Sequence, residues 1–210
     1  MSTPQRRGRP LDVAKREAII AAATRAFFES GFAGASIEQI AAHSGVSKVT
    51  VYNHFGDKRG LFTAAIETAC SQLRTHFMIG ETVRGTLRMR LLAIGEALVA
   101  FLSRPEMVQF ERRIAAETVH EPEIGATFLA AGPHRMKEAL AEFLRGMGVA
   151  GELEIEDYDL AAEQFASMCK GMGDVERRFG RPGNPARDRA RIEGAVEVFC
   201  RAYVGRTSPR

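Results

Sequence analysis

The segment from Ser36 to Phe62, SIEQIAAHSGVSKVTVYNHFGDKRGLF, constrains the fold of this chain more than any other stretch. Ser36 is followed three residues later by Gln39, a capping-box arrangement in which the serine side chain caps the start of a helix. Gly45 ends that helix, because glycine readily adopts the left-handed conformation that closes a helix. The pattern predicts a short helix over residues 37–43.

A second short helix follows the turn at Gly45. Ser47 is placed to cap it, and it is expected over residues 48–53, before Gly56 breaks it. Asp57 then caps a longer helix, expected over residues 58–77. Two short helices joined by a tight glycine-containing turn form a helix-turn-helix.

The two faces of the second short helix differ in chemistry. Val51 and Phe55 are spaced to hold it against neighbouring helices, which leaves mostly polar side chains outward. Lysine, tyrosine, asparagine and histidine on such a face suit contacts with phosphates and base edges. The candidate nucleic-acid-binding residues are Ser36, Ser47, Lys48, Val49, Thr50, Tyr52, Asn53, His54 and Lys58.

Residues 12–65 resemble the DNA-binding domain of the TetR family of transcriptional regulators. The resemblance is carried by the Tyr52-Asn53-His54-Phe55 element followed by Lys58, and by Gly31-Phe32 and Ser36. The chain departs from the family pattern at Arg59-Gly60, where acidic residues are frequent.

This resemblance implies a role for each outward residue. Contacts with base edges or nearby backbone are implied for Lys48, Thr50 and Asn53, and contacts with phosphates for Ser36, Tyr52, His54 and Lys58. Val49 either meets a thymine methyl group or fills space. Two alternatives stay open: His54 packs beside Phe55, and Lys48 is only solvated.

Positive charge is concentrated at the start of the chain. Residues 1–60 hold nine Lys/Arg and five Asp/Glu, whereas the other 150 residues hold twenty and twenty-one. This asymmetry favours an anionic partner for the first part. Residues 1–10, with Arg6, Arg7 and Arg9, are predicted to form a flexible basic arm that either enters a minor groove or serves as a solubilising tail.

From residue 81 to residue 205 the apolar spacing predicts further helices and no hairpins. They are expected over residues 84–103, 107–119, 124–147 with a kink at Gly132-Pro133, 159–178 and 186–204.

Residues 85–180 resemble the AefR-like C-terminal domain of the same family. The resemblance rests on Arg112–Glu117, Pro122–Ile124, Ala130–Pro133, Asp159–Phe165 and Lys170-Gly171. It implies an all-helical domain with a dimer interface and an internal ligand cavity. The candidate ligand contacts are Phe110, Arg113, Glu117, Phe128, Met136, Phe165 and Met168.

The last two helices are the expected dimer interface. Their apolar positions, spaced as on helix faces, can form a four-helix contact about a two-fold axis. These positions are Leu160, Phe165, Met168, Met172 and Val175 on one helix and Ile192, Ala195, Val196, Phe199 and Tyr203 on the other.

Composition and motifs exclude several other classes. No apolar run approaches the ~20 residues of a membrane span, and the arginine-rich start lacks the apolar region of a secretory signal. Three widely spaced cysteines indicate a reducing cytoplasm rather than a disulfide framework. The grouping of His120, Glu121, Glu123 and His134 matches no standard metal motif, and no cofactor is expected.

The sequence therefore predicts an all-α protein with three parts: an arm over 1–10, a helix-turn-helix domain over 11–57, and a ligand-binding and dimerisation domain over 58–210. The expected function is that of a cytoplasmic, homodimeric repressor of transcription, not an enzyme. It binds a palindromic double-stranded DNA operator and is released by a small hydrophobic or aromatic effector, with no membrane partner. Two alternatives stay open: a helical enzyme or metal-binding protein with a fused DNA module, and a ligandless nucleoid or interaction protein.

Overall fold

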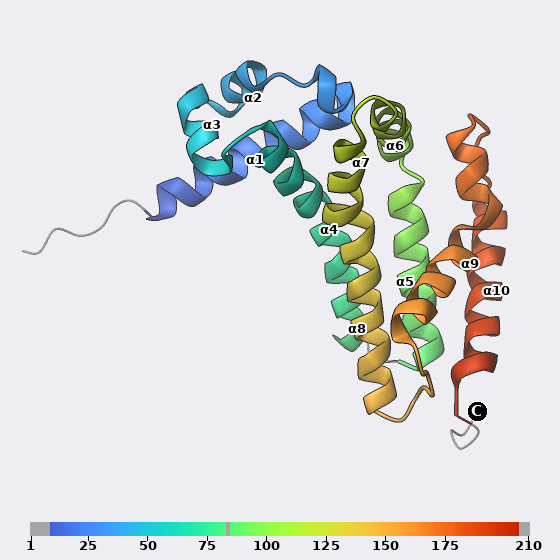
Figure 1. Cartoon of the computed structure of the whole chain (residues 1–210). Coiled ribbons are helices and arrows are strands. Elements are labelled where there is room, and N and C mark those ends of the chain that lie inside the picture. Colours follow the sequence, from blue (N-terminus) through green and yellow to red (C-terminus); the bar gives the residue numbers. More distant parts are fainter. Residues whose placement is uncertain (1–8, 83–84, 206–210) are drawn as a thin grey trace, which may run out of the picture. The chain divides into compact units, whose positions relative to one another are not determined.

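The computed structural model describes residues 9–82 and 85–205, with side chains over 12–71 and 85–205. Within those ranges every regular element is helical, as the sequence predicts (Figure 1). The elements are α1 (Arg9–Gly34), α2 (Ile37–Ser44), α3 (Lys48–Phe55), α4 (Lys58–Thr82), α5 (Leu87–Leu102), α6 (Pro105–Thr118), α7 (Pro122–Leu129), a π-helical stretch (Ala130–His134), α8 (Arg135–Val149), α9 (Tyr158–Arg178) and α10 (Pro185–Tyr203). None of the described helices is both long enough and apolar enough to cross a membrane.

The helices form two compact units whose limits differ from the boundary expected between residues 57 and 58. The first unit ends at Ala69 and also takes in Phe110–Ala131, and the second contains Cys70–Gln109 and the chain from Gly132 onward. Helices α4 and α6 are therefore each divided between the units, and α7 belongs to the first. Of the predicted basic arm, Arg9 and Pro10 begin α1, and residues 1–8 lie outside the described part of the chain.

An aromatic cluster explains why the part of α6 from Phe110 onward and all of α7 belong to the first unit. The ring of Phe110 on α6 stacks on Phe28 of α1 at 4.4 Å between centroids, and lies 6.2 Å from Phe62 of α4. Phe128 of α7 meets Phe110 edge to face at 5.7 Å. Phe62 and Phe110 are fully buried. Large aromatic side chains dominate core energetics, so this cluster ties α1, α4, α6 and α7 together.

In the second unit α9 packs against α8, α10 and α5, and α5 also packs against α10 (Figure 1). Phe165 and Phe199 meet edge to face inside this bundle at 5.3 Å. Gly95 on α5 permits a close approach, because a Cβ atom there would lie 2.8 Å from Ile192 Cγ2. At Gly132-Pro133, where the sequence predicts a kink, the chain forms a five-residue π-helical stretch that contains Pro133, a residue without a backbone N–H.

A second break interrupts α9 at Gly171, where φ is 47° and ψ is −154°. The side chain of Arg191 from α10 occupies the space beside this break, since a Cβ atom at Gly171 would lie 2.9 Å from Arg191 Cδ. Asp188 binds both Arg191 and the buried Arg177. The space that Gly171 leaves at the break is therefore filled by a side chain of α10.

The ten apolar residues expected at the dimer interface divide into three groups by burial. Five of them lie inside the bundle, which corrects their assignment to a partner: Phe165, Ile192, Ala195, Val196 and Phe199 are all buried. Met168 and Tyr203 are half-buried. Large apolar side chains of α9 that stay exposed are Leu160, Met172 and Val175, and Phe179 just beyond the helix end is 83% exposed.

Candidate nucleic-acid interface

The helix-turn-helix is held by local capping bonds, as its sequence predicts. The Ser36 hydroxyl accepts from Gln39 N at 3.4 Å, and the Ser47 hydroxyl accepts from Thr50 N at 3.1 Å. Gly45 lies in the left-handed region, with φ 68° and ψ 27°. Asp57 Oδ1 accepts from Gly60 N at 2.7 Å and so begins α4. These bonds satisfy donors that helix ends leave open.

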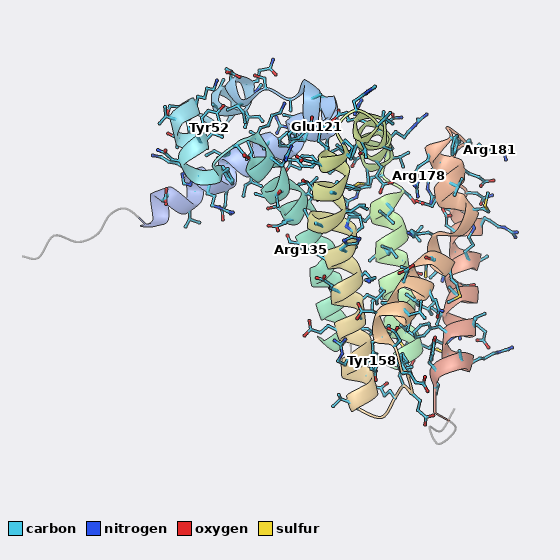
Figure 2. All side chains as sticks on the ribbon, viewed as in Figure 1. Tyr52, Glu121, Arg135, Tyr158, Arg178 and Arg181 are labelled. Carbon is cyan, nitrogen blue, oxygen red and sulfur yellow. The ribbon has the colours of Figure 1, made fainter. Side chains whose placement is uncertain are left out.

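Helix α3 presents one side to solvent. Val51 is buried and fixes the inner side, whereas Val49 is 67% exposed. Tyr52, labelled in Figure 2, is 40% exposed. Lys48 and Asn53 are also exposed, and Thr50 is half-buried with its hydroxyl 2.9 Å from that of Ser47. An exposed apolar valine beside an amphipathic tyrosine suits contact with bases rather than with water alone.

Lys48 has a partner that the sequence analysis missed. Its ammonium group forms an ion pair with the carboxylate of Glu38 on α2, and it lies 5.8 Å from the centre of the Tyr52 ring. The hydrogen bond from Lys48 lowers the pKa of the Glu38 carboxyl from 4.5 to about 2, and the pKa of Lys48 is raised. Glu38 could have been identified from the sequence as a residue of this site, because it is an acidic residue two positions after the capping serine Ser36.

His54 and Lys58 are engaged within the first unit. His54 Nε2 lies 3.3 Å from Asp12 Oδ1 on α1, and its side chain is only 16% exposed. Lys58 Nζ donates to the carbonyl of Ala33 at 3.2 Å and lies 4.8 Å from the centre of the Phe32 ring. Burial lowers the pKa of Lys58.

The largest departure from a regular helix in this unit is at Gly31 of α1, where φ is 75° and ψ is −176°. Two charged residues of α6 form hydrogen bonds with backbone groups of α1 on either side of this interruption. Glu117 Oε2 accepts from Phe32 N at 3.0 Å and from Ala33 N at 3.2 Å. Arg113 donates to the carbonyl of Phe28 at 2.7 Å. A Cβ atom at Gly31 would lie 2.1 Å from Glu117 Oε1, so the carboxylate occupies the space that only glycine leaves.

A second ionic contact joins α4 to the segment that begins α7. Arg59 pairs with Glu121 at 3.0 Å and with Glu123 (Figure 2, where Glu121 is labelled). These bonds raise the pKa of Arg59, that with Glu123 most. Arg59, the point of departure from the TetR pattern, is thus bound to acidic residues of the same unit.

The candidate ligand contacts are distributed over both units. Phe110, Arg113, Glu117 and Phe128 belong to the first unit, where Phe110 and Phe128 lie in the aromatic cluster and the two charged residues bind the α1 backbone. Met136, Phe165 and Met168 belong to the second unit, where Met136 and Phe165 are buried and Met168 is half-buried.

Two other chemistries receive no support from the described residues. Among them no three His, Cys, Asp or Glu side chains gather as a metal site. Cys169 is fully buried, and this burial raises the pKa of its thiol to about 12, which keeps it protonated and unreactive.

Comparison with known families agrees with this geometry. Residues 19–65 match the N-terminal domain model of the bacterial regulatory proteins of the tetR family. Residues 89–205 match the model of the AefR-like transcriptional repressor C-terminal domain. The chain belongs to the TetR family of transcriptional regulators, which bind DNA and are not enzymes.

Individual relatives cover most of the chain. The HTH-type transcriptional regulator BetI of Cronobacter sakazakii is 28% identical over 177 residues, which span 81% of this chain and 83% of BetI. A solved structure of a Mesorhizobium loti protein assigned to the TetR family superposes with a TM-score of 0.76 at 28% identity, over 92% of this chain and 98% of that one. The structure of the Flavonoid-responsive Regulator FrrA gives a TM-score of 0.72 at 29% identity, with the same coverage.

The bonds at the α1 break have a measurable energetic consequence. Replacing Glu117 with alanine leaves the N–H groups of Phe32 and Ala33 without their acceptor. We expect a loss of about 1.5–3 kcal/mol in the free energy of unfolding, nearer the lower value because one of the two bonds is exposed. Urea unfolding followed by circular dichroism measures it.

Glu142→Ala is the matched control, since Glu142 is an exposed glutamate of α8. Its free energy of unfolding should stay within about 0.5 kcal/mol of the parent value. Equal unfolding midpoints for Glu117→Ala and the control would contradict the role given to Glu117.

Proposed function

We propose that this chain is a homodimeric repressor that acts in the cytoplasm, binds a palindromic operator and leaves it when a small hydrophobic or aromatic effector binds. The observation that carries the proposal is the exposed side of α3, where Lys48, Val49, Tyr52 and Asn53 project from a helix fixed by the buried Val51. The matched C-terminal domain model is described as that of a transcriptional repressor, which supports repression rather than activation.

The DNA contacts proposed from the sequence fall into two main groups. Lys48, Thr50 and Asn53 lie on or beside the exposed side of α3 and are assigned to base edges or nearby backbone, and the exposed Val49 is assigned to a thymine methyl group. Ser47 is a further candidate contact at the start of α3. Phosphate contacts are assigned to Ser36, Tyr52, His54 and Lys58. The last two must exchange their Asp12 and Ala33 partners for DNA. This exchange costs part of the energy that such contacts otherwise contribute.

A dimer follows from the proposed palindrome and from the exposed side of α9. Met172 and Val175 are three residues apart and share one face of α9, and Phe179 follows at the residue that caps the end of the helix. They are 64%, 42% and 83% exposed in the single chain. Adjacent exposed side chains of this size mark an interaction surface, and a second copy of α9 about a two-fold axis provides a self-complementary partner.

The release step requires an effector that prefers a conformation unable to match the operator. Helices α4 and α6 are the candidates for transmission because each runs through both units. Arg113 and Glu117 on α6 bind the α1 backbone, so a shift of α6 alters the support of α1. The aromatic and methionine side chains among the candidate contacts favour an aromatic effector, and the flavonoid response in the name of FrrA supports this class.

The first prediction concerns the reading helix. A dimer places its two recognition helices about 34–36 Å apart, or a multiple of it, so the operator should be palindromic with that spacing. Tyr52→Ala should weaken operator binding by about 1–3 kcal/mol in a mobility-shift titration. Tyr158→Ala, a tyrosine of the second unit, should leave operator affinity unchanged. Full operator affinity in the Tyr52 variant would show that α3 is not the reading helix.

The second prediction concerns assembly. A Met172→Glu, Val175→Glu double variant places two charges on the exposed side of α9 and should sediment as a monomer with little operator affinity. Val149→Glu is the control, because Val149 is 87% exposed but lies at the end of α8. It should sediment as the parent does. A dimeric double variant would contradict this interface.

The third prediction concerns the effector. A panel of flavonoids and other lipophilic aromatic compounds, scored by thermal shift and by operator release, should contain at least one compound active in both. A coupling of about 1–3 kcal/mol, or roughly 5- to 150-fold in operator affinity, is expected. Operator DNA must then weaken binding of that compound by the same factor. A compound that binds tightly without changing operator affinity would contradict the coupling.

A further inference from the structure

The carboxylate of Glu38 is an unusual group for a surface that meets DNA. Between Ser36 and His54 it is the only acidic side chain. It lies in the first turn of α2, its side chain is 64% exposed, and it pairs with Lys48, the first residue of α3. The Ser36 hydroxyl donates to its second oxygen at 2.9 Å. The ends of both helices thus present one negative and one positive group side by side.

Phosphates repel a carboxylate, so Glu38 must have a use that outweighs this repulsion if α2 and α3 approach DNA. One use is structural, because an acidic residue in the first turn of α2 is favourable at the positive end of a helix dipole. This use does not require the ion pair with Lys48, which joins residues ten positions apart on two different helices. The pair aligns Glu38 with a residue of the reading helix.

The major groove offers one base that suits an accepting group of this kind. Cytosine itself carries only the N4 amino donor at its major-groove edge, whereas adenine carries the N7 acceptor beside its N6 amino group and so disfavours an anion. A lysine is suited to the O6 and N7 acceptors of guanine. A single G·C pair therefore shows, side by side, the donor that Glu38 needs and the acceptors that Lys48 needs.

We propose that Glu38 is a specificity-determining residue that accepts from a cytosine amino group in each operator half-site, while Lys48 donates to a guanine of the same or the neighbouring base pair. This inference rests on the proposed operator binding and adds to it the identity of one base. In the free protein the two side chains neutralise each other, and on the operator each exchanges its partner for a base.

Selection from a randomised duplex library with the full-length protein tests the proposal. The parent protein should select a cytosine at one position of each half-site, and replacing that base should weaken binding about 5- to 150-fold. Glu38→Ala should lose the preference at that position and keep it elsewhere. Glu38→Gln should move the preference toward adenine, because a glutamine amide pairs with adenine N6 and N7.

Glu29→Gln is the matched control, since Glu29 is an exposed glutamate of α1 outside the helix-turn-helix. It should select the parent sequence. Circular dichroism melting curves should show that both Glu38 variants are folded, which separates base reading from helix stability.

A change in the DNA gives an independent readout that needs no altered fold. Replacing the selected cytosine with 2-pyrimidinone, which lacks the amino group, should weaken DNA binding by the parent protein. The same replacement should leave DNA binding by the Glu38→Ala variant unchanged. The Glu38 variants could instead select the same sequence as the parent protein and bind all DNA more tightly. Glu38 would then act only through its negative charge and would read no base, which overturns the inference. If the parent protein selects no sequence at all, the proposed function fails instead.

Discussion

The break in α1 at Gly31 is the constraint on which the first unit depends. A helix that stops and restarts leaves a carbonyl on one side and N–H groups on the other, and each of these backbone groups needs a hydrogen-bond partner. Here the partners are Arg113 and Glu117, one helical turn apart on α6. The domain that carries α2 and α3 is therefore completed by a helix from far along the chain. In the proposed regulator this makes the part of α6 from Phe110 onward a component of the DNA-binding unit.

The parts of the fold that the sequence predicted are those fixed by neighbours in the chain. The caps at Ser36, Gly45, Ser47 and Asp57 act over three or four residues, so their positions follow from the residue types alone. The departure from a regular α-helix at Gly132-Pro133 follows in the same way from the missing proline N–H. The all-helical class needed no more than these signals and the apolar spacing, whereas the family resemblance rested on the Tyr52-Asn53-His54-Phe55 element with Lys58 and on Gly31-Phe32.

The parts that the sequence did not predict depend on partners far away in the chain. Nothing local to Arg113 or Glu117 indicates that each binds a backbone group about 85 positions earlier. The same is true of His54 and Lys58, whose residue types suit phosphate but whose partners in the free protein are Asp12 and Ala33. The division of the chain into units was also beyond a local reading, because it follows from rings that meet across four helices.

The break in α9 at Gly171 has a consequence for how such a regulator evolves. The residues before it pack inside the bundle around Phe165, whereas the residues after it combine the exposed Met172 and Val175 with the buried Asp174 and Arg177. Arg177 pairs with Asp188 of α10, so the exposed side chains after the break are held to the bundle by an ion pair as well as by the helix. In the proposed dimer those exposed side chains contribute to assembly, whereas α2 and α3 select bases. Mutations that change assembly and mutations that change base selection would then fall in different units, so the two properties could be inherited as separate traits.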